Sequence, residues 1–197
     1  MFITFEGIDS CGKSTQARLL NRYFISKGEN PIFVCEPGGT VVSKEIRDIV
    51  LNPKYEGICP RAEFLLYSAS RAQLVFEKIA PNLDKTIICD RYYDSSTAFQ
   101  GYGRELNLKT IKQINSFATD STIPDFTFLV DIPVEVALTR MERGSRDRIE
   151  AETKEFHQRV RKSFLTLAKK EKDRFFVLDG TKTKDAIFKK VLKILGI

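Results

Sequence analysis

The sequence predicts an α/β fold in which a five-stranded parallel sheet is covered by helices on both faces. Short runs rich in β-branched and aromatic residues alternate with longer segments whose apolar residues have helical spacing. The short runs are almost continuously apolar, which is typical of strands buried on both faces. The 197 residues contain no repeat, low-complexity tract or long linker, so we expect residues 1–197 to form a single domain.

Five runs are expected to form the strands, and each has the apolar, β-branched or aromatic composition of a buried strand. In chain order they are Phe2–Glu6 (FITFE), Pro31–Cys35 (PIFVC), Thr86–Asp90 (TIICD), Phe126–Asp131 (FTFLVD) and Arg174–Leu178 (RFFVL). Helical periodicity places helices between and after them, at Lys13–Lys27, Val41–Leu51, Arg61–Ala80, Leu108–Ala118, Pro133–Glu142, Glu152–Lys170 and Lys184–Leu195. Ligands of such sheets bind beyond the carboxyl ends of the strands. We therefore expect the segments that follow the strands to converge on one functional edge.

The composition is that of a soluble globular protein, with 42% apolar and 29% charged residues. The net charge of +6 suits nucleic acid, a membrane surface or small anions equally, so the positions of the arginines matter more than the total. No charged leader precedes an apolar segment, and no apolar stretch approaches the roughly 18 residues of a membrane span. We expect a chain that is neither exported nor membrane-spanning.

The four cysteines, Cys11, Cys35, Cys59 and Cys89, are too widely spaced for a C-x-x-C metal or redox motif. Three of them lie in or beside apolar runs, so we expect small buried hydrophobic side chains. Reduced thiols predict a cytoplasmic protein.

The segment G-I-D-S-C-G-K-S at residues 7–14 matches the phosphate-binding pattern G-x-x-x-x-G-K-[ST]. It lies between the first strand and the first helix, the context that such a P-loop requires. Gly7 and Gly12 let the backbone turn its N–H groups inward, Lys13 reaches the β- and γ-phosphates, and the Ser14 hydroxyl is expected to bind Mg²⁺. The sequence thus predicts a P-loop NTPase three-layer fold, with ATP contacts from Gly7, Ile8, Asp9, Ser10, Cys11, Gly12, Lys13, Ser14 and Thr15.

The metal also needs a carboxylate, and two predicted strands end in aspartate. Asp90 is followed by Arg91, which places metal ligation beside a phosphate-binding cation. Asp131 is followed by I-P-V-E and precedes a helix, the usual setting of an N-cap. We assign Asp90 to the magnesium site and Asp131 to capping.

Three classes of nucleotide-binding protein compete: a GTPase, a nucleic-acid-dependent ATPase and a small phosphotransferase. A GTPase would need a guanine-reading N-K-x-D, and none of the asparagines is followed by lysine. A nucleic-acid-dependent ATPase should carry a basic stripe with interleaved aromatics, whereas the runs here, such as Lys169–Lys172, suit a solvated helix face. A small phosphotransferase remains, with neither nucleic acid nor a membrane as partner.

A phosphotransferase needs cations for the charge that spreads over the transferring phosphoryl group. The segment RMERGSRDRIE contains four arginines around a flexible Gly-Ser pair, at Arg140, Arg143, Arg146 and Arg148. We interpret residues 142–150 as a short lid that brings arginines to the phosphates and excludes water. The alternative is an exposed charged connection between two helices.

Six motifs occur in order along essentially the whole chain: FEGIDSCGKST, EPGGT, EFLLYSASRAQL, DRYYDSSTAFQGYGR, RGSRDRIE and LDGT. Together they resemble the thymidylate kinase family. The arginine-rich lid, with no arginine between Gly7 and Gly12, is similar to the bacterial type. The resemblance implies transfer of the γ-phosphoryl group of ATP to dTMP with Mg²⁺, giving dTDP and ADP, by a homodimer. The alternative to this activity is a kinase of the same fold that phosphorylates another nucleoside monophosphate.

The resemblance also implies residue roles. Asp9 would accept a hydrogen bond from the sugar 3′-hydroxyl of the monophosphate, so that one loop serves both substrates. Phe64 would stack on thymine, Arg71 would donate to its O4 edge, and Ser68 would lie on the same wall. The other positions matched to the monophosphate are Glu36, Arg47, Arg91, Ser96, Gln100 and Tyr102. On the ATP side, Asp179, Gly180 and Thr181 would run along the adenine, with Arg140 near the ring face.

Catalysis is assigned to Lys13, Arg91, Arg143, Arg146 and Arg148, with no covalent intermediate and no general base. One departure from the family pattern stands before P-G-G-T, where Arg-Glu is common and this chain has Cys35-Glu36. A cation near the acceptor phosphate is therefore missing or replaced.

Overall fold

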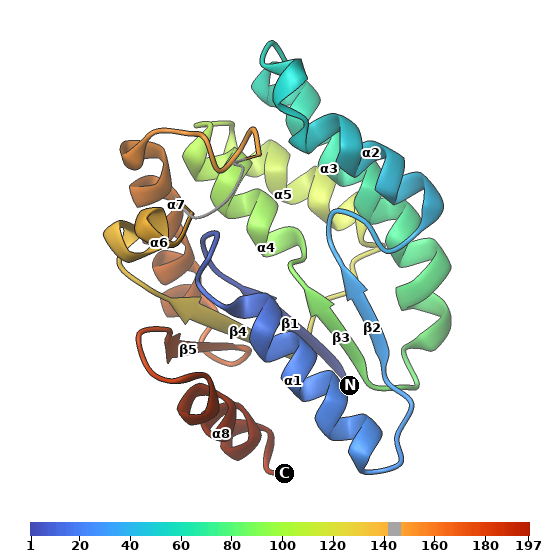
Figure 1. Cartoon of the computed structure of the whole chain (residues 1–197). Helices are drawn as coiled ribbons and strands as arrows, with labels where there is room; N and C mark the ends of the chain where they lie inside the picture. Colours follow the sequence, from blue (N-terminus) through green and yellow to red (C-terminus); the bar gives the residue numbers. More distant parts are fainter. Residues whose placement is uncertain (142–146) are drawn as a thin grey trace.

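The computed structural model describes residues 1–141 and 147–197. Its centre is a parallel sheet with the strand order β2-β3-β1-β4-β5 (Figure 1). The strands are β1 (Phe2–Glu6), β2 (Ile32–Cys35), β3 (Ile87–Asp90), β4 (Phe126–Asp131) and β5 (Phe175–Asp179). The structure confirms the predicted α/β fold, and each strand lies within about a residue of its expected position.

Helices cover both faces of the sheet. Helices α1 and α8 pack on each other and on one face, seen nearest the viewer in Figure 1, whereas α7 packs on β4 and β5 from the other. The bounds are α1 (Lys13–Ser26), α2 (Val41–Leu51), α3 (Pro60–Leu74), α4 (Tyr93–Ser96), α5 (Leu108–Ala118), α6 (Val134–Met141), α7 (Lys154–Lys170) and α8 (Lys184–Leu195). Short helical segments join them, namely η1 (Pro53–Tyr55), η2 (Val75–Ile79), η3 (Ala80–Asn82) and η4 (Thr97–Gly103).

Buried apolar side chains hold the layers together. Phe5 and Phe128 stack across β1 and β4 at a centroid distance of 5.3 Å, and both are fully buried. On α7, Phe156 and Phe164 contact the Phe99 ring of η4. Because η4 is fixed to the core in this way, the polar residues on its other side are held in place for binding.

Two helical regions differ from the sequence expectation. The segment predicted as one helix over 61–80 is α3 followed by the wider π-type turns of η2. The segment after β3, to which the sequence assigned no helix, is helical throughout α4 and η4. The serines and glycines of this segment have low helix propensity and hide the periodicity, and the burial of Ala98 and Phe99 outweighs that low propensity.

The cysteines divide into two kinds. Cys11 and Cys89 are buried as expected, whereas Cys35 and Cys59 are exposed, and all four are free thiols. Among the helices of residues 1–141 and 147–197, none combines the length and apolar character needed to cross a membrane.

Candidate functional site

The loop between β1 and α1 has the shape that the P-loop pattern predicts. Gly7 has φ 140°, and a Cβ there would lie 2.5 Å from the Val130 carbonyl oxygen, so a larger residue cannot fit. Gly12 adopts a left-handed conformation with φ 99° directly before α1. The N–H groups of the first turn, beginning at Lys13, therefore lie at the mouth of the loop and can bind an anion.

The Asp9 carboxylate contacts one cation on each side of this loop. Its carboxylate accepts hydrogen bonds from Lys13 Nζ, at 3.5 Å, and from Arg91 Nη2. Burial favours the protonated acid, but the charges of Arg91 and Lys13 outweigh it and lower the pKa of Asp9 to about 2. The carboxylate is therefore ionised at neutral pH and is available as an acceptor between two cations.

Arg91, at the end of β3, is held by several contacts. Its Nη1 donates to the Gly7 carbonyl and to Ser95 Oγ, both at 2.9 Å, and its guanidinium lies 5.0 Å from the centre of the Phe99 ring. Burial alone would lower the pKa of Arg91, but Asp9 and Glu6 raise it. Arg91 is thus a permanent, oriented cation beside the loop.

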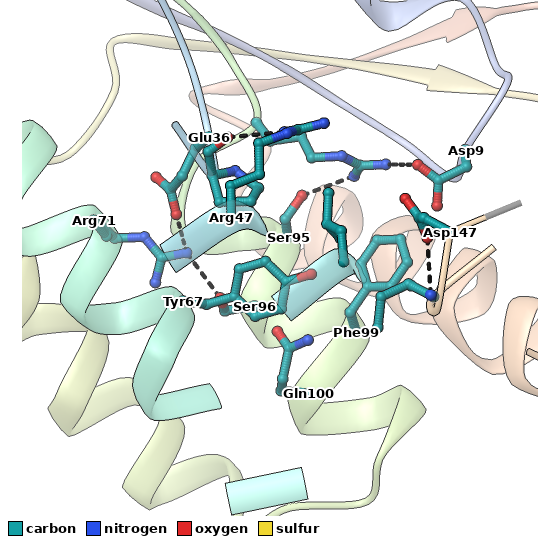
Figure 2. Close-up of a pocket in the computed structure, with 14 residues that line it drawn as sticks. Asp9, Glu36, Arg47, Tyr67, Arg71, Ser95, Ser96, Phe99, Gln100 and Asp147 are labelled. Carbon is teal, nitrogen blue, oxygen red and sulfur yellow. Dashed lines mark hydrogen bonds and ion pairs between the residues drawn. The ribbon is translucent and has the colours of Figure 1, made fainter. Parts of the chain in front are cut away.

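A cavity lined by polar and aromatic side chains opens next to Arg91 and Asp9. Figure 2 shows side chains from the P-loop, α2, α3 and η4 around it. The lining residues are Asp9, Glu36, Pro37, Arg47, Leu51, Tyr67, Arg71, Arg91, Ser95, Ser96, Phe99, Gln100, Asp147 and Ile149. The structure thus brings together Asp9, Glu36, Arg47, Arg71, Arg91, Ser96 and Gln100 from the sequence expectation.

Arg71 forms the fixed end of this cavity. It is only 1% exposed, pairs with Glu36, and donates from Nη1 to Asn115 Oδ1 and from Nη2 to Ser96 Oγ, both at 2.8 Å. Burial raises the pKa of Glu36 and Arg71 opposes that effect. On the other wall, Arg47 Nη1 donates to the Pro37 carbonyl at 2.8 Å.

Three expected monophosphate contacts lie outside this cavity. Phe64 is buried at 3% exposure and does not line it, and Ser68 donates its hydroxyl to the Phe64 carbonyl at 2.8 Å. Tyr102 lines a different hollow, between η4, α5 and α7. Sequence reasoning missed two aromatic residues of the cavity, Phe99 and Tyr67, and the Tyr67 ring borders the cavity together with Arg71 (Figure 2).

The arginine-rich segment is only partly described. Arg143 and Arg146 fall in 142–146, outside the described residues. Arg148 is described, and it lies in a buried network away from the P-loop. Its Nε donates to the Val50 carbonyl at 2.9 Å, and its Nη2 lies 2.8 Å from Glu63 Oε2. In this structure Arg148 thus links α2 and α3, and its assignment to catalysis stays a prediction.

We expect Arg148→Ala to lower the free energy of unfolding by about 1.5–3 kcal/mol, because Glu63 loses an ion-pair partner and the Val50 carbonyl loses a charged hydrogen-bond donor. Urea denaturation measures this, with Arg22→Ala, an exposed arginine of α1, as control. Unchanged stability with a depressed kcat would contradict the structural assignment and return Arg148 to catalysis.

The two strand-ending aspartates have different surroundings. Asp90 Oδ1 is buried and has no hydrogen-bond partner among the described residues. The Asp131 carboxylate is paired instead with Arg161, whose Nε and Nη2 donate at 2.8 and 2.9 Å. The expected capping role of Asp131 is thus replaced by an ion pair between β4 and α7, and Asp90 keeps a carboxylate oxygen available.

The residues expected around adenine lie at the same edge of the sheet. Arg140 in α6 donates from Nη1 to the Ser10 carbonyl of the P-loop at 3.0 Å. Asp179, at the end of β5, accepts hydrogen bonds from the Thr181 backbone and hydroxyl, which forms a tight turn. A Cβ on Gly180 would lie 2.6 Å from Ile132 Cγ2 and 2.8 Å from Val130 Cγ1, so this turn packs against side chains at the end of β4.

Comparisons with known proteins agree on one family. The model of the family described as thymidylate kinase matches residues 5–191. The thymidylate kinase of Carboxydothermus hydrogenoformans is 51% identical over 95% of this chain and 92% of its own length, and that of Fervidobacterium nodosum is 47% identical over 100% and 98%. The crystal structure of thymidylate kinase from Ehrlichia chaffeensis superposes with a TM-score of 0.81 at 33% identity, covering 100% of this chain and 98% of that one. The chain therefore belongs to the thymidylate kinase family.

Proposed function

We propose that this protein transfers the γ-phosphoryl group of ATP to dTMP, giving ADP and dTDP. One observation carries the proposal most strongly. Asp9 lies in the P-loop, contacts Lys13 on the side of the phosphate cradle, and contacts Arg91 on the side of the cavity. A donor on the loop and an acceptor in the cavity would therefore meet at this carboxylate.

The chain's own groups act by position and charge. The P-loop N–H groups and Lys13 bind the donor phosphates, while Arg91 and Arg47 face the acceptor phosphate from the other side. Holding both in line supplies most of what phosphoryl transfer requires from a protein. Because a phosphate monoester is already largely dianionic near neutral pH, the acceptor oxygen attacks without a general base.

The far end of the cavity is suited to the pyrimidine. The Tyr67 ring offers a stacking face, and Arg71 and Gln100 offer polar atoms toward the base edge (Figure 2). We propose Tyr67 for the stacking role that the sequence assigned to Phe64. The roles suggested for Ser68, Tyr102, Arg143 and Arg146, and the boundaries of a lid over 142–150, stay predictions.

Ser14 and Asp90 fit a Mg²⁺ site. Their hydroxyl and carboxylate oxygens are the ligands that this ion prefers, and Asp90 Oδ1 has no other partner in the described part of the chain. No group of three His, Cys, Asp or Glu side chains in residues 1–141 and 147–197 is arranged to hold a metal ion by itself, which suits an ion that keeps several waters. When bound, Mg²⁺ supplies positive charge to the donor phosphates.

We also propose a homodimer in the cytoplasm. Exposed apolar side chains occur on three helices of which α3 packs on the other two, namely Val41 of α2, Leu65 of α3 and Phe117 of α5, which is 88% exposed. Sedimentation should therefore give twice the 22.5 kDa of one chain. Free thiols at all four cysteines support a reducing compartment.

The experiment that tests the function compares acceptors. ADP release is measured with ATP and either dTMP, dUMP, dCMP or dGMP, and also with added DNA or RNA and no monophosphate. We expect dTMP to give the highest kcat/KM. A higher value for another monophosphate, or turnover that needs nucleic acid, would contradict the proposal.

A further inference from the structure

Glu63 lies behind the cavity wall and gathers three polar side chains. It is only 1% exposed, in the first turn of α3. Its Oε1 accepts from Gln100 Nε2 at 2.9 Å and from Arg104 Nε at 3.2 Å, and its Oε2 accepts from Arg104 Nη2 at 3.1 Å. Arg148 Nη2 lies 2.8 Å from the same Oε2. A helix-terminal acid needs none of these partners, so the cluster calls for another explanation.

The carboxylate decides which way the Gln100 amide is turned. A glutamine amide has a donor end and an acceptor end, and rotation by 180° exchanges them at almost no cost. An ionised carboxylate can only accept, and the Glu63 carboxylate lies against the guanidinium groups of Arg104 and Arg148. The NH₂ group of Gln100 must therefore face Glu63, and its carbonyl oxygen Oε1 is left for the cavity that Gln100 lines (Figure 2).

We propose that Glu63 is a positioning residue that sets base selectivity through Gln100. With its carbonyl toward the cavity, Gln100 accepts a hydrogen bond from a ring N–H. Thymine and uracil have this N–H at position 3, whereas cytosine has a bare acceptor nitrogen there, which would face the carbonyl oxygen without a proton between them. This inference rests on the proposed function, because it concerns the pyrimidine end of the same cavity.

The two arginines hold the carboxylate itself in place. Arg104 also donates to Glu152 and lies over the Phe156 ring at 4.8 Å, and Arg148 is fixed to the end of α2. Glu63 therefore cannot follow Gln100 if the amide rotates. An unpaired buried donor or acceptor costs about 1–3 kcal/mol, so the wrong base loses one to two orders of magnitude.

Glu63→Gln tests the proposal, because a glutamine at this position can donate as well as accept and so releases the Gln100 amide. We expect kcat/KM for dTMP divided by kcat/KM for dCMP to fall at least tenfold, while KM for ATP changes less than about twofold. Glu152→Gln is the matched control, since it also removes a carboxylate from Arg104 but does not contact Gln100. Its dTMP-to-dCMP ratio should equal that of the wild type.

A second comparison separates positioning from general damage. In a Gln100→Leu background, Glu63→Gln should leave the ratio unchanged, because the amide through which it acts is gone. If Glu63→Gln alone does not fold, the same dTMP-to-dCMP ratio is measured in the double variant Glu63→Gln/Arg104→Met, which loses one negative and one positive charge together. A folded variant whose ratio matches the wild type, whatever its stability, would overturn the proposal. Failure of the proposed function would appear earlier, as a wild-type enzyme that does not prefer dTMP.

Discussion

Lys13→Ala is expected to lower kcat by about 10²–10³-fold, the loss found when one preorganised charge or donor is removed from a transition state. Lys13 opens α1 within the glycine-rich loop and is 7% exposed, so its ammonium is held at the mouth of the anion site. A water molecule that replaces it supplies no fixed positive charge for the migrating phosphoryl group.

Steady-state ADP release at saturating dTMP measures this loss. The control is Lys109→Ala, which removes a lysine from the exposed face of α5. Circular dichroism should show the same fold and a similar melting temperature for both variants. Turnover of Lys13→Ala within about threefold of the wild type would contradict the assignment of the loop to ATP.

Replacing Arg71 should affect the monophosphate far more than ATP. Arg71 borders the cavity and its partners Glu36 and Ser96 lie in the same wall. Arg71→Gln alone would leave Glu36 buried without its cation, at a cost of about 3–5 kcal/mol, so the change is made together with Glu36→Gln. We expect KM for dTMP to rise about 10–100-fold, which corresponds to loss of a charged hydrogen bond, and KM for ATP to stay within about threefold.

The matched control for this change is Arg61→Gln, which makes the same substitution on the exposed side of α3. It should leave both KM values unchanged. An equal rise in KM for ATP and dTMP in the double variant would contradict the assignment of Arg71 to the acceptor site. Its role would then be structural alone.

The sheet could be predicted closely because its signal is local. Each strand is a short apolar run, and the ends of β1 and β4 coincide with the ends of those runs. Pro31 has no N–H to donate to the ladder, and β2 begins one residue later, at Ile32. The helical turns of α4 and η4 could not be read in this way, since packing of Phe99 on α7, and not propensity, fixes them.

The site could be predicted where residues lie in the P-loop or directly after a strand, as Asp9, Glu36 and Arg91 do. The resemblance assigned Phe64 to thymine, whereas the geometry of α3 favours Tyr67. Phe64 and Arg71 share a helix face, but seven residues span about 10 Å along the axis, whereas four residues span about 6 Å. For this reason we propose that a single base contacts Arg71 and Tyr67 rather than Arg71 and Phe64.

The side chains that contact Glu63 could not be predicted from the sequence, for a different reason. The contacts join α3 to residues about 40 and 85 positions later in the chain, at Arg104 and Arg148. Nothing in the local pattern of α3 distinguishes this glutamate from one that stabilises a helix start. Only the folded arrangement shows that it orients a cavity residue.

The central claim is that donor and acceptor bind end to end, on either side of Asp9. Inhibition by a bisubstrate compound, adenosine and thymidine joined through five phosphates, tests it most directly. We predict competition against both ATP and dTMP, with affinity at least 10²-fold above that of either nucleotide alone, because the second half binds intramolecularly. Competition against only one substrate, with no gain in affinity over the corresponding nucleotide, would contradict the account.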